Sequence, residues 1–122
     1  MEVRLLVFGD RNWEDYEMIL EEVRRRSPDV VIEGEARGAD KMGRAAAMEL
    51  GIPFEPYPAQ WHIYGRAAGP IRNQQMLDEG KPTEAVGFHD DIANSKGTHD
   101  MWRRLKDATI PVVIKSHGDT TS

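Results

Sequence analysis

The sequence predicts an α/β fold, a Rossmann-like three-layer sandwich with a mostly parallel five-stranded sheet and helices on both faces. Short apolar runs alternate with amphipathic stretches of helical length along the chain. The first apolar run is continuous rather than alternating, which is typical of a strand that is covered on both faces. Because crossovers between parallel strands are right-handed, few topologies remain, and we expect a Rossmann-like strand order.

The strands are expected at the apolar runs of the chain. The first runs from Leu5 to Phe8 and is closed by Gly9. Three prolines between Ile52 and Pro58 exclude an interior position for that segment over its full length, so it suits the edge of the sheet. The five expected strands cover residues 5–8, 29–33, 52–58, 84–88 and 110–114.

Four helices are expected between these strands, and their ends are marked by residues that start or stop helices. Asp15 can cap the first helix, whose apolar residues recur with helical spacing, and Pro28 follows its end. Gly51 and Pro53 stop the second helix, and Pro70 suits the first turn of the third. The expected helices cover residues 15–26, 40–50, 70–77 and 97–108.

Length and composition favour one globular domain over residues 1–115, followed by a small polar tail at 116–122 that we expect to be disordered. The net charge of -5 is spread along the chain, which argues against nucleic acid as a partner. Cysteine is absent and no apolar stretch reaches membrane-spanning length, so we expect a cytoplasmic protein without disulfides or a membrane partner. The acids and histidines lack a recognised ligand spacing, and no metal is expected.

The segment from Gly34 to Asp40 joins the second strand to the second helix through a glycine-containing turn. A helix N-terminus leaves backbone N–H groups without partners and carries a partial positive charge, so such a turn suits a phosphate or a carboxylate. An ordinary connection is the alternative, because Gly34 and Gly38 alone match neither a dinucleotide fingerprint nor a P-loop. In Rossmann-like sheets, ligands bind at the carboxyl ends of the strands, where this loop lies with the other strand-end loops.

Cations and aromatic side chains occur in those other loops. Arg11 offers a planar fork of donors, and Trp13 offers a face for a base, unless the two are a surface arginine and a packing aromatic. Arg72 falls in the first turn of the third helix, where it can add donors to the same anion site. Gly97 and Thr98 form a helix start that can meet a second phosphate oxygen, although ordinary capping explains this pattern equally well.

Four motifs follow one another along the chain: Gly9-x-Arg11-x-Trp13, Gly34-x-Ala36-Arg37-Gly38-Ala39-Asp40, Trp61-x-x-Tyr64-Gly65-x-x-Ala68-Gly69-Pro70-Ile71-Arg72-Asn73 and Gly97-Thr98-x-Asp100-Met101. In order and spacing they resemble the YspA-like, cpYpsA-related branch of the SLOG superfamily, over nearly the whole chain except the tail. The resemblance implies a Rossmann-like fold and a nucleotide or a nucleotide-derived ligand. Relatives in the superfamily include the LOG-type phosphoribohydrolases and the DprA-type single-strand DNA binders.

Three positions depart from the family pattern. Asp10 stands where a serine is usual and Glu35 where a second glycine is usual, so each adds negative charge beside the expected phosphate site unless an arginine of the site neutralises it. These acids could instead accept hydrogen bonds from ribose hydroxyls. The LOG-type enzymes carry a glutamate at the position of Met101, and Asp100, one residue away, faces differently on a helix.

We expect the protein to bind or sense a nucleotide or a nucleotide-derived, ADP-ribose-like phosphate ligand, with no further cofactor. The alternative is phosphoribohydrolase-type cleavage of the N-glycosidic bond of a nucleoside monophosphate, for which Glu35, Asp40 and Asp100 are the candidate acids. Single-strand DNA binding and a purely structural domain are further alternatives. The third loop, expected over residues 59–69, carries the aromatics Trp61 and Tyr64, which allow a homo-oligomer. The expected ligand-binding residues are Gly9, Arg11, Trp13, Gly34, Glu35, Arg37, Gly38, Asp40, Tyr64, Arg72, Asn73, Gly97 and Thr98.

Overall fold

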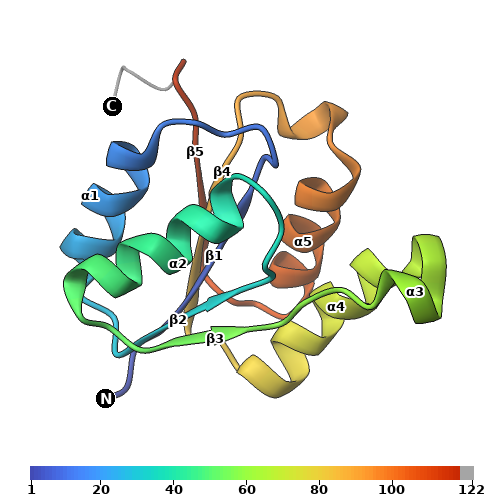
Figure 1. The fold of residues 1–122 in the computed structure, drawn as a ribbon, viewed down its shortest axis with the longest axis horizontal. Coiled ribbons are helices and arrows are strands. Elements are labelled where there is room, and N and C mark those ends of the chain that lie inside the picture. The colour runs from blue at the N-terminus through green and yellow to red at the C-terminus, as the bar shows by residue number, and fades with distance from the viewer. Residues whose placement is uncertain (119–122) are drawn as a thin grey trace.

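The computed structural model describes residues 1–118, and its centre is a sheet of five parallel strands (Figure 1). Their order across the sheet is β3-β2-β1-β4-β5, and each neighbouring pair is parallel. The predicted α/β, Rossmann-like class is therefore confirmed, and β3 lies at an edge, as its prolines require. The strands are β1 (Arg4–Gly9), β2 (Val30–Glu33), β3 (Phe54–Pro56), β4 (Glu84–Phe88) and β5 (Val112–Lys115).

Helices cover both faces of the sheet (Figure 1). On one face lie α1 (Tyr16–Arg26) and α2 (Ala39–Leu50), and on the other lie α4 (Ala68–Gln75) and α5 (Lys96–Asp107). A single-turn helix, α3 (Trp61–Tyr64), projects from the body beyond α4. Within residues 1–118, no helix has the length and apolar character needed to cross a membrane.

The alternating side chains of β1 divide the core into two layers. Leu5 and Val7 pack against α1 and α2, whereas Leu6 and Phe8 face the layer beneath α5. All four side chains are buried, which explains why this strand has no polar alternation. This burial on both faces fits the position of β1 as the central strand of the sheet. At its carboxyl end, Gly9 pairs with Phe88 of the neighbouring strand β4.

The helix ends follow the predicted signals closely, with one exception. The carboxylate of Asp15 caps α1 by accepting a hydrogen bond from the Met18 N–H at 3.2 Å. In α2, however, the N-cap position is Gly38, which has no side chain to cap with. The carboxylate of Asp40 instead accepts from the Ala36 N–H at 3.3 Å and so braces the preceding loop.

The third loop, predicted to be irregular, contains two helical turns. The Gln60 carbonyl accepts hydrogen bonds from the N–H groups of Ile63 and Tyr64, both at 3.0 Å, which closes the turn of α3. A 3₁₀ turn over Gly65–Ala67 leads directly into α4, and a π-helical turn over Met76–Gly80 extends that helix. Local hydrogen bonds within this proline-flanked segment thus produce helix where composition alone indicated a loop.

The chain after β5 returns to the body as far as the structure describes it. His117 stacks on Trp13 with ring centroids 4.5 Å apart, and its ring nitrogens lie 3.0 Å from an Asp15 oxygen and 2.9 Å from an Asp90 oxygen. Of the predicted tail at 116–122, residues 119–122 lie outside the described part of the chain.

Candidate functional site

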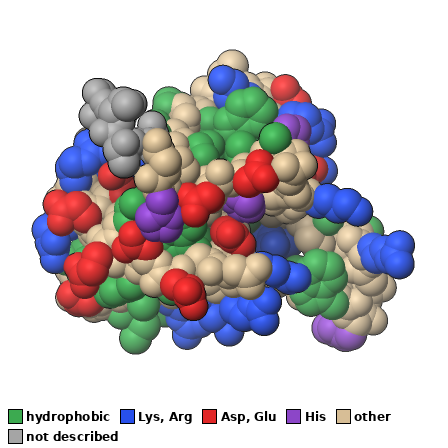
Figure 2. All heavy atoms as spheres, turned by 90° about the horizontal axis from the view of Figure 1, so that it is seen from above, with side chains coloured by type: hydrophobic (Ala, Val, Ile, Leu, Met, Phe, Trp, Pro, Cys, Tyr) green, Lys and Arg blue, Asp and Glu red, His purple; other side chains and the backbone are tan. Residues whose placement is uncertain are grey.

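A cleft of about 1000 Å³ opens at the carboxyl ends of the strands. Its walls come from the loops that follow β1, β2, β3 and β4, from one face of α4 and from the first turn of α5. Figure 2 looks onto this edge and shows a hollow between the body and the projecting helix α3. The strand order reverses between β1 and β4, so the cleft lies at the position where Rossmann-like sheets bind ligands.

Most of the predicted ligand-binding residues line this cleft. Three of them do not: Trp13, Gly38 and Tyr64. The residues that the fold brings together around the cleft are Gly9, Arg11, Gly34, Glu35, Arg37, Asp40, Arg72, Asn73, Gly97 and Thr98.

Neither Trp13 nor Tyr64 lines the cleft. Trp13 is buried in the core, 5.7 Å from Phe88 between ring centroids, and His117 covers one of its faces. Its indole N–H donates to the Asp15 carbonyl at 3.0 Å. Of the two interpretations of this residue, the structure therefore supports the packing aromatic. Tyr64 is half exposed on α3, away from the cleft.

Gly38 acts through the backbone by allowing two strand-end loops to touch. Its φ of 79° is left-handed, and a Cβ here would lie 2.3 Å from the Asp10 carbonyl oxygen. This close approach lets the Ala39 N–H donate to the same carbonyl at 3.1 Å. The loop after β2 is thereby held against the loop after β1, and the Ala39 N–H is occupied within the protein.

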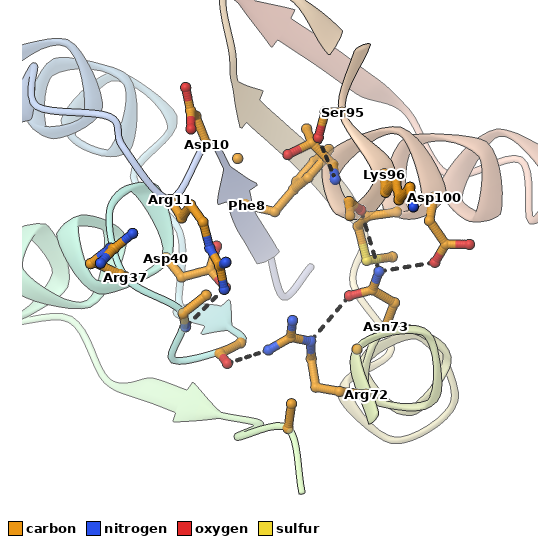
Figure 3. A pocket seen from close by; sticks show the side chains of 18 of the residues that line it. Phe8, Asp10, Arg11, Arg37, Asp40, Arg72, Asn73, Ser95, Lys96 and Asp100 are labelled. Carbon is orange, nitrogen blue, oxygen red and sulfur yellow. Dashed lines mark hydrogen bonds between the residues drawn. The ribbon is translucent and has the colours of Figure 1, made fainter. Parts of the chain in front are cut away.

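Arg72 crosses the cleft from α4 to the loop after β2. Its Nη1 donates to the Gly34 carbonyl, and its Nε donates to Asn73 Oδ1 at 3.1 Å (Figure 3). A Cβ at Gly34 would lie 2.5 Å from Nη1, so only glycine leaves room for this contact. Two of the five N–H bonds of the guanidinium are thus used, and its third nitrogen carries no dashed line in Figure 3.

The charge of Arg72 lies in partly buried surroundings. Burial lowers the pKa of its guanidinium, and the nearby charge of Arg11 lowers it further, although Asp40 and Glu33 act in the opposite direction. Arginine nevertheless stays protonated in proteins. Two cations therefore approach each other here, an arrangement that an anion between them would stabilise.

A hydrogen-bond chain continues from Arg72 to α5. Asn73 Nδ2 donates to Asp100 Oδ2 at 3.0 Å, and the same oxygen accepts from Arg104 Nε at 2.8 Å. Burial alone would raise the pKa of Asp100, but the hydrogen bonds from Arg104 and Asn73 outweigh it and lower that pKa. Asp100 is consequently an ionised, fully engaged anchor between helices, and a poor proton donor.

The arginines divide into two groups by position. Of the eleven in the sequence, seven pair with carboxylates: Arg4, Arg24, Arg25, Arg26, Arg44, Arg103 and Arg104. None of these seven lines the cleft. Among residues 1–118, the four arginines without a carboxylate at ion-pair distance all line it, and they are Arg11, Arg37, Arg66 and Arg72. The lysines show no such division, but Lys41 and Lys96 also line the cleft.

Glu35 has a backbone conformation that is unusual for a residue with a side chain. Its φ is 57°, in the left-handed region that glycine adopts most readily. The carboxylate pairs with Arg44 of α2 at 2.6 Å. Arg44 lies outside the cleft, so this charge is neutralised by an arginine that the site motifs did not include.

Two further acids lie beneath the same loop. Burial raises the pKa of Asp40 to about 6, against the lowering influence of Arg72. Glu33, the last residue of β2, is fully buried, and burial together with Asp40 and Glu35 raises its pKa to about 7. Its Oε1 accepts from the Glu35 N–H at 2.6 Å, whereas Oε2 has no hydrogen-bond partner among the described residues. Both carboxyl groups hold a proton more readily than usual.

The first turn of α5 is capped internally. Ser95 Oγ accepts from the Thr98 N–H at 3.1 Å, so this N–H is already engaged. Gly97 is exposed, and a Cβ there would meet nothing within 4 Å. Ordinary capping thus accounts for Thr98, while Gly97 offers an open stretch of backbone at the cleft wall.

The histidines and acids near β4 and α5 are dispersed. His89 Nδ1 accepts from the Asp91 N–H at 2.9 Å, and Asp90 contacts His117. Asp100 is held by arginines. Over residues 1–118, no three histidine or acidic side chains converge in a way that could hold a metal ion.

Several residues of the site were not among the predicted ligand-binding residues. Lys41, Lys96, Arg66 and Trp61 line the cleft, and Glu33 lies beneath it. A signal for Glu33 was present, because an acid that directly ends a buried parallel strand must lie at the ligand edge of the sheet. Lys41, Trp61 and Lys96 lie in helices and Arg66 lies in a 3₁₀ turn, and only the fold brings these four to one cavity.

Two comparisons with known proteins agree with this architecture. The family model described as "YspA, cpYpsA-related SLOG family" matches residues 3–64, which contain β1, β2 and the loops that follow them. The chain is also 32% identical over 120 residues to the gene 61 protein of Mycobacterium phage D29, and this similarity covers 90% of the chain and 94% of that protein. The chain therefore belongs to the YspA, cpYpsA-related SLOG family, as its motifs indicated.

Proposed function

We propose that the protein binds a nucleotide or a nucleotide-derived ligand by its phosphate group, in the cleft at the carboxyl ends of the strands. The division of the arginines carries this proposal, because the four that lack a carboxylate all line the cleft. Membership of the SLOG family supports a nucleotide-related ligand. A chain with a net charge of -5 otherwise has little reason to leave cations unpaired in one place.

Arg72 is the main phosphate-binding residue in this proposal. Its contacts with Gly34 and Asn73 orient the guanidinium and leave its remaining N–H bonds for phosphate oxygens. Arg11 and Arg37, which are exposed on the opposite wall, supply charge from the other side (Figure 3). Arginine binds phosphate with two parallel hydrogen bonds, and each such bond contributes about 1.5–3 kcal/mol.

The acids of the cleft do not cancel this positive charge. Glu35 is paired with Arg44, and Asp100 is paired with Arg103 and Arg104. Asp40, with its pKa raised to about 6, lowers its negative charge by taking up a proton when an anion approaches. Asp10 also lines the cleft and has no cation at ion-pair distance among the described residues. With four arginines and two lysines in its lining, the cleft still keeps an excess of positive charge.

Calorimetric titration with AMP, ADP-ribose and ribose 5-phosphate tests the proposal. We expect binding to at least one of them, and a loss of roughly 100-fold in affinity for Arg72→Met, since two charge-assisted hydrogen bonds are removed. Arg24→Met is the matched control, because Arg24 is exposed and paired with Glu21. Absence of binding to all three probes, or equal affinity of the Arg72→Met protein, would contradict the proposal.

Cleavage of the N-glycosidic bond is the second candidate function, and Asp40 is the observation that favours it. A leaving base needs a proton as water attacks C1′ of the ribose, and a carboxyl group with a pKa of about 6 can donate one near neutral pH. Asp40 lines the cleft, whereas the engaged Asp100 does not suit this role. Free base released from AMP and lost in Asp40→Asn would support hydrolysis, and release at the uncatalysed rate would exclude it for that substrate.

A further inference from the structure

Trp61 is a large aromatic side chain at the mouth of the cleft. It is the first residue of α3, it lines the cleft, and 53% of its surface is exposed. The α3 turn is closed by the hydrogen bond from the Gly65 N–H to the Trp61 carbonyl. A half-exposed indole on a hydrogen-bonded turn offers a flat apolar surface in a defined position.

The neighbouring helix supports this indole and links it to the phosphate-binding residues. A Cβ on Gly69 would lie 3.4 Å from Cη2 of Trp61, so the ring edge lies against α4 where that helix has no side chain. Gly69, Arg72 and Asn73 all line the cleft, and their spacing places them on one face of α4. Arg72 therefore follows the support of the indole by about one helical turn, ~5 Å along the axis.

The residues that line the cleft include two sets of different chemistry, which we call the inner and the outer section. The inner section contains Arg72, Arg11 and Asp40 and is strongly polar. The outer section is formed by Pro58, Ala59, Trp61 and Arg66, so it is apolar with one cation. A ligand that fits both sections has a phosphate at one end and a flat apolar ring at the other.

We propose that Trp61 is the stacking platform for the base of the bound nucleotide, with the base in the outer section and the 5′-phosphate at Arg72. This inference rests on the proposed function and adds the orientation of the ligand and the residue that recognises its ring. Among the three tryptophans, Trp13 is buried and Trp102 does not line the cleft. Tyr64 is exposed on the same helix but also does not line it.

Stacking predicts a pattern that phosphate binding alone does not. Base–aromatic stacking typically contributes enough that alanine substitution weakens binding by roughly tenfold or more. The loss applies only to ligands that carry a base. Arg66, in the 3₁₀ turn that follows α3, also lines the cleft, so purine and pyrimidine rings with carbonyl groups find a donor there.

The experiment compares AMP with ribose 5-phosphate, which has the phosphate and sugar but no base, by calorimetry. We expect Trp61→Ala to weaken AMP binding at least tenfold. Its affinity for ribose 5-phosphate should stay within about twofold of that of the parent. Trp61→Phe should retain most of the AMP affinity, because phenylalanine also stacks. Tyr64→Ala is the matched control and should bind both probes like the parent. AMP should quench tryptophan emission in the parent but not in Trp61→Phe.

The outcomes separate this inference from the proposed function. If Trp61→Ala binds AMP as tightly as the parent, or weakens both probes equally, the stacking role is overturned while phosphate binding stands. If the parent binds ribose 5-phosphate but not AMP, the outer section does not accept a base and the inference is again overturned. If the parent binds neither AMP nor ribose 5-phosphate, the stacking inference is overturned, whereas the proposed function fails only if ADP-ribose does not bind either.

Discussion

The outer surface and the cleft edge of this molecule treat charge in opposite ways. On the outer surface, Arg26 is 11% exposed and is held by Glu22 at 2.9 Å and Glu84 at 2.8 Å. At the cleft edge, Arg72 is also largely enclosed, but its hydrogen-bond partners are a carbonyl and an amide. A buried cation with neutral partners keeps its charge available to an incoming anion, whereas a paired one does not. Stability explains the first arrangement, and the proposed ligand explains the second.

The acids mirror this contrast. Glu22 is enclosed like Glu33, but hydrogen bonds from Arg25 and Arg26 outweigh its burial and lower its pKa. Glu33 has no cation partner among the described residues and its pKa is raised to about 7. Basic and acidic side chains that lack an ion-pair partner are therefore gathered at the cleft edge.

The largest effect is expected for Glu33→Gln. Because the folded-state pKa is raised from 4.5 to about 7, the carboxyl group stabilises the fold below about pH 4.5, and this contribution is lost as the pH rises through 7. The shift corresponds to about 3 kcal/mol. In urea unfolding, the variant should therefore gain on the parent by up to that amount between pH 5 and pH 8. If the unfolding free energies of the variant and the parent change in parallel with pH, Glu33 is not the group that causes the pH dependence. Glu21→Gln, at an exposed site, is the control.

Arg26→Met should show the opposite behaviour to the Arg72 variant. Removing Arg26 leaves two carboxylates, Glu22 and Glu84, without this partner and should lower the free energy of unfolding by about 2 kcal/mol. Affinity for a phosphate ligand should not change, since Arg26 does not line the cleft. Urea unfolding and calorimetry on the same sample measure the two effects. A loss of affinity in the Arg26 variant would break the division between structural and ligand-binding arginines.

Gly34→Ala tests whether the position of Arg72 matters, not only its charge. The added Cβ would lie 2.5 Å from Nη1 of Arg72 and 2.8 Å from Oδ2 of Asp40, so the guanidinium must move. Both neighbours are flexible side-chain ends, and we expect a small stability change but a roughly tenfold loss of affinity for ribose 5-phosphate, about 1.4 kcal/mol. Gly118→Ala is the matched control, because a Cβ there meets nothing and Gly118 does not line the cleft. Unchanged affinity in Gly34→Ala would mean that Arg72 binds from another position.

The smallest effect is expected for Glu35→Gly. Glycine suits the φ of 57° better than glutamate, which favours the variant by up to about 1 kcal/mol. Loss of the partly exposed pair with Arg44 costs about 0–1 kcal/mol. The two terms nearly cancel, so thermal unfolding should shift by only a few degrees. A large destabilisation would indicate that Glu35 has contacts beyond Arg44.

Hydrophobic periodicity and turn residues were enough to predict the fold class, the five strands and the four main helices. They were enough because each segment's local preference for strand or helix is the same as the structure it adopts in the fold. The sequence also predicted that the loops carrying the motifs meet at one edge of the sheet, since parallel strands bring their carboxyl ends together. Which charges are paired could not be read from the sequence. Arg44 lies on α2, nine positions after Glu35, and pairs with it. His117, more than a hundred positions after Trp13, stacks on its ring.

The sequence by itself thus determined which loops meet at the carboxyl edge of the sheet and which residue types those loops carry. Only the tertiary structure decided that Trp13 packs in the core, that Trp61 faces the cleft, and that Arg72 contacts Gly34. The physical reason is that secondary structure follows from near neighbours along the chain, whereas burial and charge pairing depend on residues that folding alone brings within contact distance.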